Sequence, residues 1–294
     1  MTTIVDKCSP ETYIRELFEK NGPDPDDFDD IMELIDQVSA DDVEPFRELM
    51  NGILNPATII GFSFTKPFGY NGDFFIIEKI YQQYVNPDPR YRKWDEFFHR
   101  LPAAIAVINR KKLAVDMLHK LNRNAGGEPR HVLILGSGPV TEVFEYFEET
   151  DDNNLYFDLI DLDQRAIDYA KSKHRANLSY LNFQNKNVIR HVPDKKYDLL
   201  WSAGLFDYFK DKHFVFLLKR YYEFVAEGGE MVIGNFNVEN PSRKIMEVLG
   251  DWFLYHRSEK ELLGFARQAD IPENCASVIR EPLGINLFLH VAKK

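Results

Sequence analysis

Two glycines interrupt the chain directly after the short apolar run 131–135, and a helical pattern begins at Thr141. Glycine lets the backbone turn sharply and approach a ligand closely. We therefore expect Gly136, Ser137 and Gly138 to face a ligand beside the free N–H groups of the following helix. A glycine-rich turn alone is a weak signal, because many strand-to-helix turns contain glycine and bind nothing.

A carboxylate stands at the end of the next apolar run, which covers residues 155–160. Asp161 lies about 20 residues beyond the glycines, the distance at which an acid can reach a ribose diol. That geometry serves a dinucleotide and S-adenosylmethionine (SAM) equally well. Asp163 is a second candidate for the cofactor site, with the alternative that it caps the following helix.

Two features favour SAM over a nicotinamide cofactor. The nicotinamide fingerprint needs Gly or Ala six positions into the loop, where this chain has Thr141. Near the end, the apolar runs 277–280 and 285–292 flank the turn 281–284, which predicts an antiparallel pair that closes the sheet. A nicotinamide domain does not end in this way, so an NAD-dependent oxidoreductase is the weaker alternative.

The elements that must position these residues follow from the change in apolar spacing near residue 128. Strand-like runs then alternate with helical patterns, which predicts a doubly wound, Rossmann-like α/β sheet with helices on both faces. The expected strands cover 131–135, 155–160, 178–183, 197–201 and 230–234, and the expected helices cover 141–149, 164–174 and 211–225. Before residue 121 the spacing is helical throughout. We expect an all-helical N-terminal cap over 1–125, a linker near 122–129 and a SAM-binding domain over 126–294.

Composition narrows the classes of partner. The 294 residues carry a formal net charge of −11, which disfavours binding to nucleic acid. Cys8 and Cys275 form no C-x-x-C pair, so neither a disulfide framework nor a thiolate metal site is expected. The first ten residues contain no apolar leader, and no apolar run has the roughly 18 residues of a membrane span. We expect a cytoplasmic protein without membrane insertion.

Read in order, four motifs resemble the series of class I SAM-dependent methyltransferases over about residues 128–294. They are Leu-Gly-Ser-Gly-Pro (135–139), Leu-Ile-Asp-Leu-Asp (159–163), Tyr-Asp-Leu-Leu-Trp-Ser-Ala-Gly (197–204) and Glu-Gly-Gly-Glu-Met-Val-Ile-Gly (227–234). The resemblance implies that residues 136–138 face the amino-acid part of SAM and that Asp161 holds the ribose. It also places Asn187 and Val188 by the adenine, although the family often has an acid at position 187. Ser202 and Ala203 would line the pocket near the sulfonium.

A narrower resemblance spans both halves of the chain. Residues 66–73, 109–110, 202–208 and 234–236 are similar to bacterial 3-hydroxypalmitate methyl ester biosynthesis proteins. This likeness implies that a hydroxy fatty acid accepts the methyl group on its carboxylate. Other small molecules with an oxygen or nitrogen acceptor remain alternatives, and so does a protein that binds SAM without catalysis.

Several side chains outside the motif series are candidates for the site. Tyr70 and Asp73 lie in a Gly/Pro-rich segment that is either a lid over the cofactor or a turn in which Asp73 caps a helix. Arg110 suits bidentate pairing with the carboxylate of SAM, or is a surface arginine beside two lysines. Asp207 and Tyr208 follow the fourth strand, at the edge where doubly wound folds bind ligands.

The same reasoning marks Asn235 and Phe236, which are expected to follow the fifth strand at that edge. His174 is surrounded in sequence by Lys171, Lys173 and Arg175. We expect its ring to be solvated and to have no role as a base.

Overall fold

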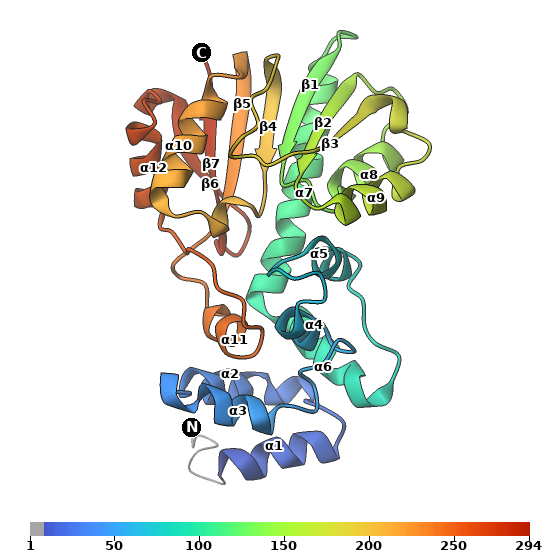
Figure 1. Ribbon diagram of the computed structural model, residues 1–294, viewed down its shortest axis with the longest axis vertical. Coiled ribbons are helices and arrows are strands. Elements are labelled where there is room, and N and C mark those ends of the chain that lie inside the picture. Colours follow the sequence, from blue (N-terminus) through green and yellow to red (C-terminus); the bar gives the residue numbers. More distant parts are fainter. Residues whose placement is uncertain (1–8) are drawn as a thin grey trace. The chain divides into compact units, whose positions relative to one another are not determined.

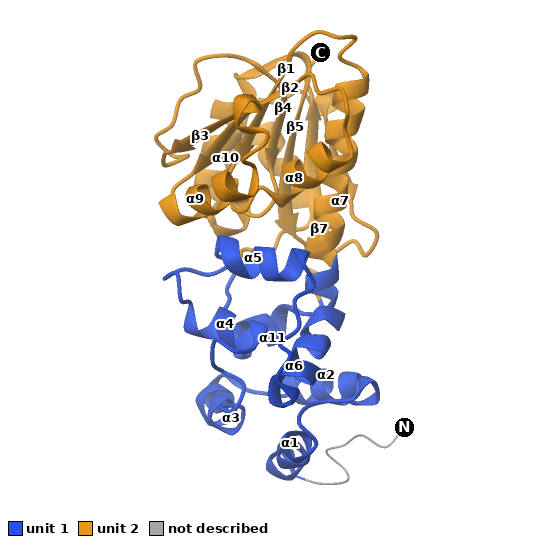
Figure 2. Ribbon diagram, turned by 90° about the vertical axis from the view of Figure 1, so that its right-hand side faces the viewer, with its two compact units in different colours: residues 1–105, 241–253 blue, residues 106–240, 254–294 orange. Residues whose placement is uncertain are grey.

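The computed structural model describes residues 9–294. Cys8 and most of the first ten residues, which were searched for an apolar leader in the sequence, lie outside this range. The chain forms two compact units (Figures 1 and 2). Unit 1 comprises residues 1–105 and 241–253, and unit 2 comprises residues 106–240 and 254–294. No helix in the described part of the chain is long and apolar enough to cross a membrane.

Within its described residues, unit 1 contains helices and connecting turns but no strand. Its helices are α1 (Pro10–Glu19), α2 (Phe28–Asp36), α3 (Val43–Leu49), α4 (Ile59–Thr65), α5 (Phe74–Tyr81), α6 (Pro89–Arg100), the start of α7 (Pro102–Arg123) and α11 (Arg243–Val248). Side-chain oxygens of Ser9, Thr58 and Asp88 accept backbone N–H groups at the starts of α1, α4 and α6. These caps satisfy donors that a helix start leaves without partners, so the local sequence fixes where these helices begin.

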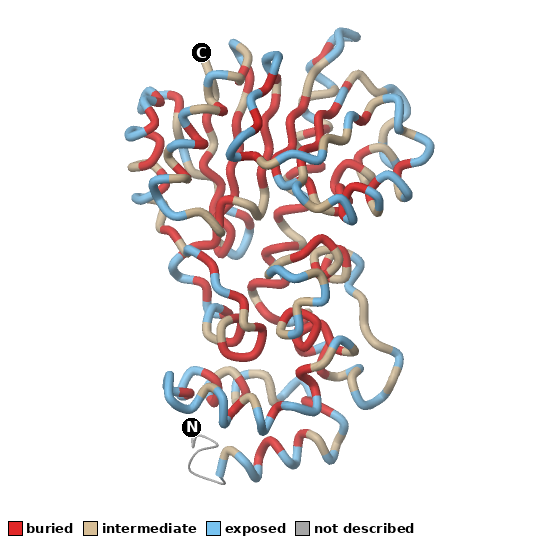
Figure 3. The backbone as a smooth tube through the Cα atoms, in the orientation of Figure 1, coloured by how far each residue is buried: buried red, intermediate tan, exposed pale blue. Residues whose placement is uncertain are grey.

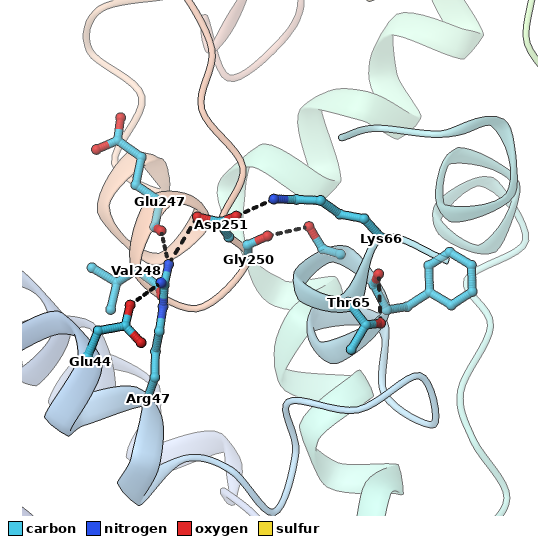
Figure 4. A network of polar contacts seen from close by, with 10 residues as sticks. Glu44, Arg47, Thr65, Lys66, Glu247, Val248, Gly250 and Asp251 are labelled. Atoms are coloured by element: carbon cyan, nitrogen blue, oxygen red, sulfur yellow. Dashed lines mark hydrogen bonds and ion pairs between the residues drawn. The ribbon is translucent and has the colours of Figure 1, made fainter. Parts of the chain in front are cut away.

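Residues 241–253 leave the sheet unit and complete unit 1, and a polar network holds them there (Figure 4). Arg47 on α3 donates from Nε to the carbonyl of Val248, at 2.7 Å, and also pairs with Asp251. Lys66, at the end of α4, forms a second ion pair with Asp251. Ser63 adds a hydrogen bond to the carbonyl of Gly250, at 3.0 Å. Two cations therefore share one carboxylate and join the two sequence segments of unit 1.

Unit 2 contains a seven-stranded sheet in the order β3-β2-β1-β4-β5-β7-β6. Its elements are β1 (Arg130–Leu135), α8 (Thr141–Glu148), β2 (Leu155–Asp161), α9 (Gln164–Lys173), β3 (Leu181–Asn185), β4 (Tyr197–Ser202), α10 (Asp211–Tyr222), β5 (Val225–Phe236), α12 (Glu259–Gln268), β6 (Ala276–Arg280) and β7 (Asn286–Ala292). Strands β1 to β5 are parallel, whereas β7 is antiparallel to both β5 and β6. This confirms the predicted doubly wound sheet with its antiparallel last strand.

Helices cover both faces of this sheet. Side chains of α10 and α12 pack on one face, and those of α7, α8 and α9 pack on the other. The inner strands β2, β1, β4, β5 and β7 are buried along most of their length (Figure 3), as expected for strands between two helical layers, whereas the edge strands β3 and β6 are more exposed. The carboxyl ends of the parallel strands therefore emerge together at one edge of the sheet.

The structure differs from the expected elements at several ends. Residues 178–180 form a 3-10 turn before β3, α10 ends at Tyr222, and β5 extends to Phe236. Asn235 and Phe236 are thus the last residues of β5, and the expectation that they follow the strand is wrong. Residues 124–129 connect α7 to β1 within unit 2, so the expected linker 122–129 begins with the last two residues of α7. The expected division of the chain into folding domains at 125/126 stays a prediction.

Candidate functional site

The turn between β1 and α8 has the glycine conformations that its sequence predicts. Gly136 and Gly138 have φ values of 63° and 55°, in the left-handed region that glycine enters without a steric penalty. The N–H of Gly136 donates to the carbonyl of Ile160, at 2.9 Å, and so does the N–H of Ser137, at 3.1 Å. A Cβ on Gly136 would lie 3.0 Å from the Cβ of Leu205, so the loop after β4 approaches this turn closely.

Asp161 is hydrogen-bonded to the glycine turn. Its Oδ2 accepts the N–H of Gly138, at 2.8 Å, and its Oδ1 accepts the N–H of Asp163, at 2.8 Å. Burial raises the pKa of Asp161, and these two N–H donors oppose the rise. The structure thus brings together the two motifs that lie about 20 residues apart in sequence, and it orients the Asp161 carboxylate.

Asp163 caps α9 through the N–H of Arg165, at 2.9 Å, and also pairs with the Arg165 guanidinium. The capping alternative is therefore confirmed, and a contact of Asp163 with the cofactor stays a prediction. Asn187 uses Oδ1 to accept the N–H of Ile189, at 2.8 Å, in a local turn. Val188 is buried in the core on the α10 face. The roles of residues 187 and 188 beside adenine stay predictions.

The end of β4 lies beside the end of β1. The Ser202 hydroxyl donates to the carbonyl of Leu135, at 3.0 Å, and Ser202 is fully buried, whereas Ala203 is partly buried. A Cβ on Gly204 would lie 3.0–3.3 Å from the guanidinium of Arg110. Arg110 is 5% exposed, so the surface alternative for this residue is wrong. Gly204 allows the guanidinium to lie against the backbone that follows β4.

Arg110 is a cation among buried carboxylates. Burial raises the pKa of Glu142, at the start of α8, and the charge of Arg110 opposes that rise. Burial also raises the pKa of Asp207 to about 6, opposed by the Phe236 N–H and by the charges of Arg110 and Arg257. One guanidinium thus stabilises the ionised forms of two carboxylates that come from different elements.

Asp207 lies in the 3-10 turn Phe206–Tyr208 after β4. Its Oδ1 accepts the N–H of Phe236, at 2.7 Å, and its carbonyl accepts the N–H of Tyr255, at 2.8 Å. Its other carboxylate oxygen accepts no hydrogen bond from residues 9–294. One oxygen of Asp207 is therefore structural, and the residue as a whole is 1% exposed. Tyr208, the next residue, is partly buried.

The Asn235 side chain has a structural use. Its amide nitrogen donates to the carbonyl of Tyr255, at 2.8 Å, and its oxygen accepts from the Arg257 guanidinium, at 2.7 Å. Arg257 is 2% exposed and also bonds the carbonyls of Phe206 and Phe209. These contacts fix the segment that returns from residues 241–253 to the sheet. Phe236 is buried at the end of β5.

The predicted lid segment belongs to unit 1. The Asp73 side chain accepts hydrogen bonds from the N–H groups of Phe75 and Ile76, both at 2.9 Å. It therefore caps α5, which confirms the alternative that Asp73 is a helix cap. Tyr70 is 38% exposed. The closeness of Tyr70 to a cofactor stays a prediction.

Sequence reasoning missed two residues of this region. Leu162, between two acids, is 67% exposed, and Leu205 lies against Gly136. The apolar residue directly after Asp161 could have been noticed in the sequence. The contact between Leu205 and Gly136 could not, because it depends on the tertiary fold. The expectation that the His174 ring is solvated is wrong, because this residue is 1% exposed and its Nε2 lies 3.0 Å from the carbonyl of Val140.

Comparisons with known proteins place the fold. No family model matches this sequence, and no curated protein matches it. A possible exported protein from Bordetella parapertussis has a similar structure, with TM-score 0.62 and 15% identity over 75% of this chain and 79% of that chain. A candidate O-methyltransferase from Nostoc punctiforme matches with TM-score 0.52 and 14% identity, over 65% of this chain and 58% of that chain. With the strand order and the antiparallel β7, the fold is that of class I methyltransferases.

Proposed function

We propose that this protein transfers a methyl group from SAM to an oxygen or nitrogen of a small-molecule acceptor. The observation that carries the proposal is the hydrogen bond from the Gly138 N–H to Asp161. It joins the glycine turn to an oriented carboxylate at the carboxyl edge of a sheet with the class I methyltransferase order. Ligands of doubly wound folds bind at this edge.

The residues present fit SAM. The Ser137 hydroxyl is buried and has no hydrogen-bond partner within residues 9–294, so a polar ligand group would satisfy it. Asp161 keeps lone pairs for ribose hydroxyls beside its two N–H donors. Arg110 would pair with the ligand carboxylate, and the exposed Leu162 would cover one face of the adenine. Asp163, Asn187, Val188, Ser202 and Ala203 remain proposed neighbours of the cofactor.

When bound, SAM supplies a methyl group on a positively charged sulfur, which is electrophilic without further activation. The protein then has to align the acceptor and exclude water. An acceptor that carries a proton also needs a base. Asp207 is the proposed base, since one of its oxygens accepts no hydrogen bond within the described chain and its pKa near 6 leaves it ionised at pH 7. Tyr208 would contact the acceptor, and Tyr70 would close over the site.

The finer proposal for the acceptor is the carboxylate of a hydroxy fatty acid, which rests on the sequence resemblance. A carboxylate is already ionised at pH 7 and needs no base, whereas an amine or a phenol needs one. The acceptor class therefore decides whether Asp207 takes part in the reaction. We also propose a cytoplasmic location for the protein.

Calorimetry with S-adenosylhomocysteine (SAH) and NADH, followed by a screen of acids, amines and phenols with methyl-labelled SAM, tests the proposal. We expect SAH to bind, NADH not to bind and label to enter one acceptor class. Binding of NADH alone would support the oxidoreductase alternative, against which the antiparallel β7 and Thr141 argue. SAH binding without labelling of any acceptor would support a non-catalytic SAM-binding protein.

A further inference from the structure

Helix α8 begins at a strained residue. Val140, which precedes its first turn, has φ 55° and ψ 35°, in the left-handed region, and is fully buried. A β-branched side chain collides with the backbone in this region, so Val140 stays there only if its surroundings hold it. Strain of this kind is concentrated at ligand-binding sites.

The end of α9 holds this residue. His174 Nε2 lies 3.0 Å from the carbonyl of Val140, and since a carbonyl only accepts, Nε2 carries the hydrogen. The His174 ring packs edge-on against Phe144 of α8, with centroids 5.6 Å apart. One residue earlier, Lys173 Nζ donates to the Thr141 hydroxyl, at 2.8 Å. Two adjacent residues at the end of α9 thus bond to Val140 and Thr141, the two residues at which α8 starts.

The strained residue is also connected to the glycine turn. The Val140 N–H donates to the carbonyl of Ser137, at 3.3 Å, and the neighbouring Gly138 N–H donates to Asp161. The φ and ψ angles of Val140 therefore set the angle between this turn and the first N–H groups of α8. A return of Val140 to an ordinary conformation would move these groups relative to each other.

We propose that His174 and Lys173 are positioning residues that keep Val140 strained and so set the affinity for the amino-acid part of SAM. The inference rests on the proposed function, and neither residue needs to touch the cofactor. If the contact between α8 and α9 were purely structural, breaking it would lower the stability of the protein but would not weaken the binding of the amino-acid part of the ligand more than that of the rest.

The test uses the full chain and two ligands, SAH and methylthioadenosine, which lacks the amino-acid part. In His174→Leu we expect SAH to bind about tenfold more weakly, the effect of one lost hydrogen bond, and methylthioadenosine to bind as before. His174→Gln keeps an N–H near the Nε2 position and should retain most of the affinity. Glycine accepts the left-handed region, so in a Val140→Gly background His174→Leu should have little further effect.

If His174→Leu fails to fold, Lys173→Met and Thr141→Val provide the same test. Since these two residues bond to each other, the double mutant should lose no more SAH affinity than either single mutant. Lys171→Met is the matched control, since Lys171 is an exposed lysine on the same helix. Equal weakening of both ligands, or the same loss with glycine at position 140, would overturn the inference. If wild-type protein binds neither ligand, the proposed function fails instead.

Discussion

Asp161→Ala is the substitution that most directly tests the cofactor site. It removes the acceptor of two backbone N–H groups, at 2.8 Å each, and the proposed acceptor of the ribose hydroxyls. A hydrogen bond to a charged group contributes about 1.5–3 kcal/mol, so SAH should bind roughly ten- to hundredfold more weakly. Two unsatisfied N–H groups also remain, and they should lower the unfolding free energy by roughly 1–3 kcal/mol each if buried.

The two effects require separate measurements. Calorimetry gives the affinity for SAH, and urea unfolding gives the stability of the same sample. Asp163→Ala is the control, because it removes the cap of α9 and the pair with Arg165 but leaves the Asp161 carboxylate in place. We expect this control to lose about 1 kcal/mol of stability and much less affinity than Asp161→Ala. Unchanged SAH affinity in folded Asp161→Ala would refute the assignment of the ribose to this carboxylate.

Three further predictions concern other charged and lid residues. If Asp207 is the base, its pKa of about 6 makes turnover of a protonated acceptor rise as the pH increases through that value. In pH-rate profiles, Asp207→Asn should abolish this rise and slow turnover about 10²- to 10⁴-fold. Hydrogen bonds from His290 and Lys120 lower the pKa of Glu230 to about 2. In urea unfolding, Glu230→Gln should therefore lower the unfolding free energy by about 1–3 kcal/mol at pH 7, and this loss should disappear as the pH falls from about 4.5 to 2. An equal loss of unfolding free energy at pH 7 and at pH 2 would contradict the pairing. If the lid proposal holds, Tyr70→Ala should lower kcat more than it lowers the affinity for SAM, and Tyr70→Phe should separate the contribution of the ring from that of the hydroxyl. Normal turnover in Tyr70→Ala would mean that the segment is an ordinary turn.

Local patterns account for what the sequence predicted correctly. The alternation of apolar runs with helical spacing is a property of neighbouring residues, and it predicted the sheet and its antiparallel end. The glycine turn was also predictable, because positive φ values favour glycine at positions 136 and 138. The closeness of Asp161 to the glycine turn was predictable as well, because the carboxyl ends of adjacent parallel strands lie at the same edge of the sheet.

Tertiary packing decides the features that the sequence did not reveal. Arg110 stands beside Lys111 and Lys112 and reads as a surface residue, yet the missing side chain of Gly204 lets it pack against the backbone. Basic neighbours in sequence suggested a solvated His174, but α9 ends at Lys173 and the ring of His174 turns toward Val140. Neither outcome follows from helical periodicity, because each depends on a residue more than 30 positions away.

The hydrogen bonds of the glycine turn limit how it can hold a cofactor. Within residues 136–140, the N–H groups of 136 and 137 bond to Ile160, that of 138 to Asp161 and that of 140 to Ser137, while Pro139 has none. No backbone donor of this turn is therefore left for the carboxylate of SAM. In the proposed function that carboxylate must be bound by side chains, by the first N–H groups of α8, or by both. Under that proposal Arg110 and the Ser137 hydroxyl, which has no partner within residues 9–294, are the side chains suited to bind the carboxylate.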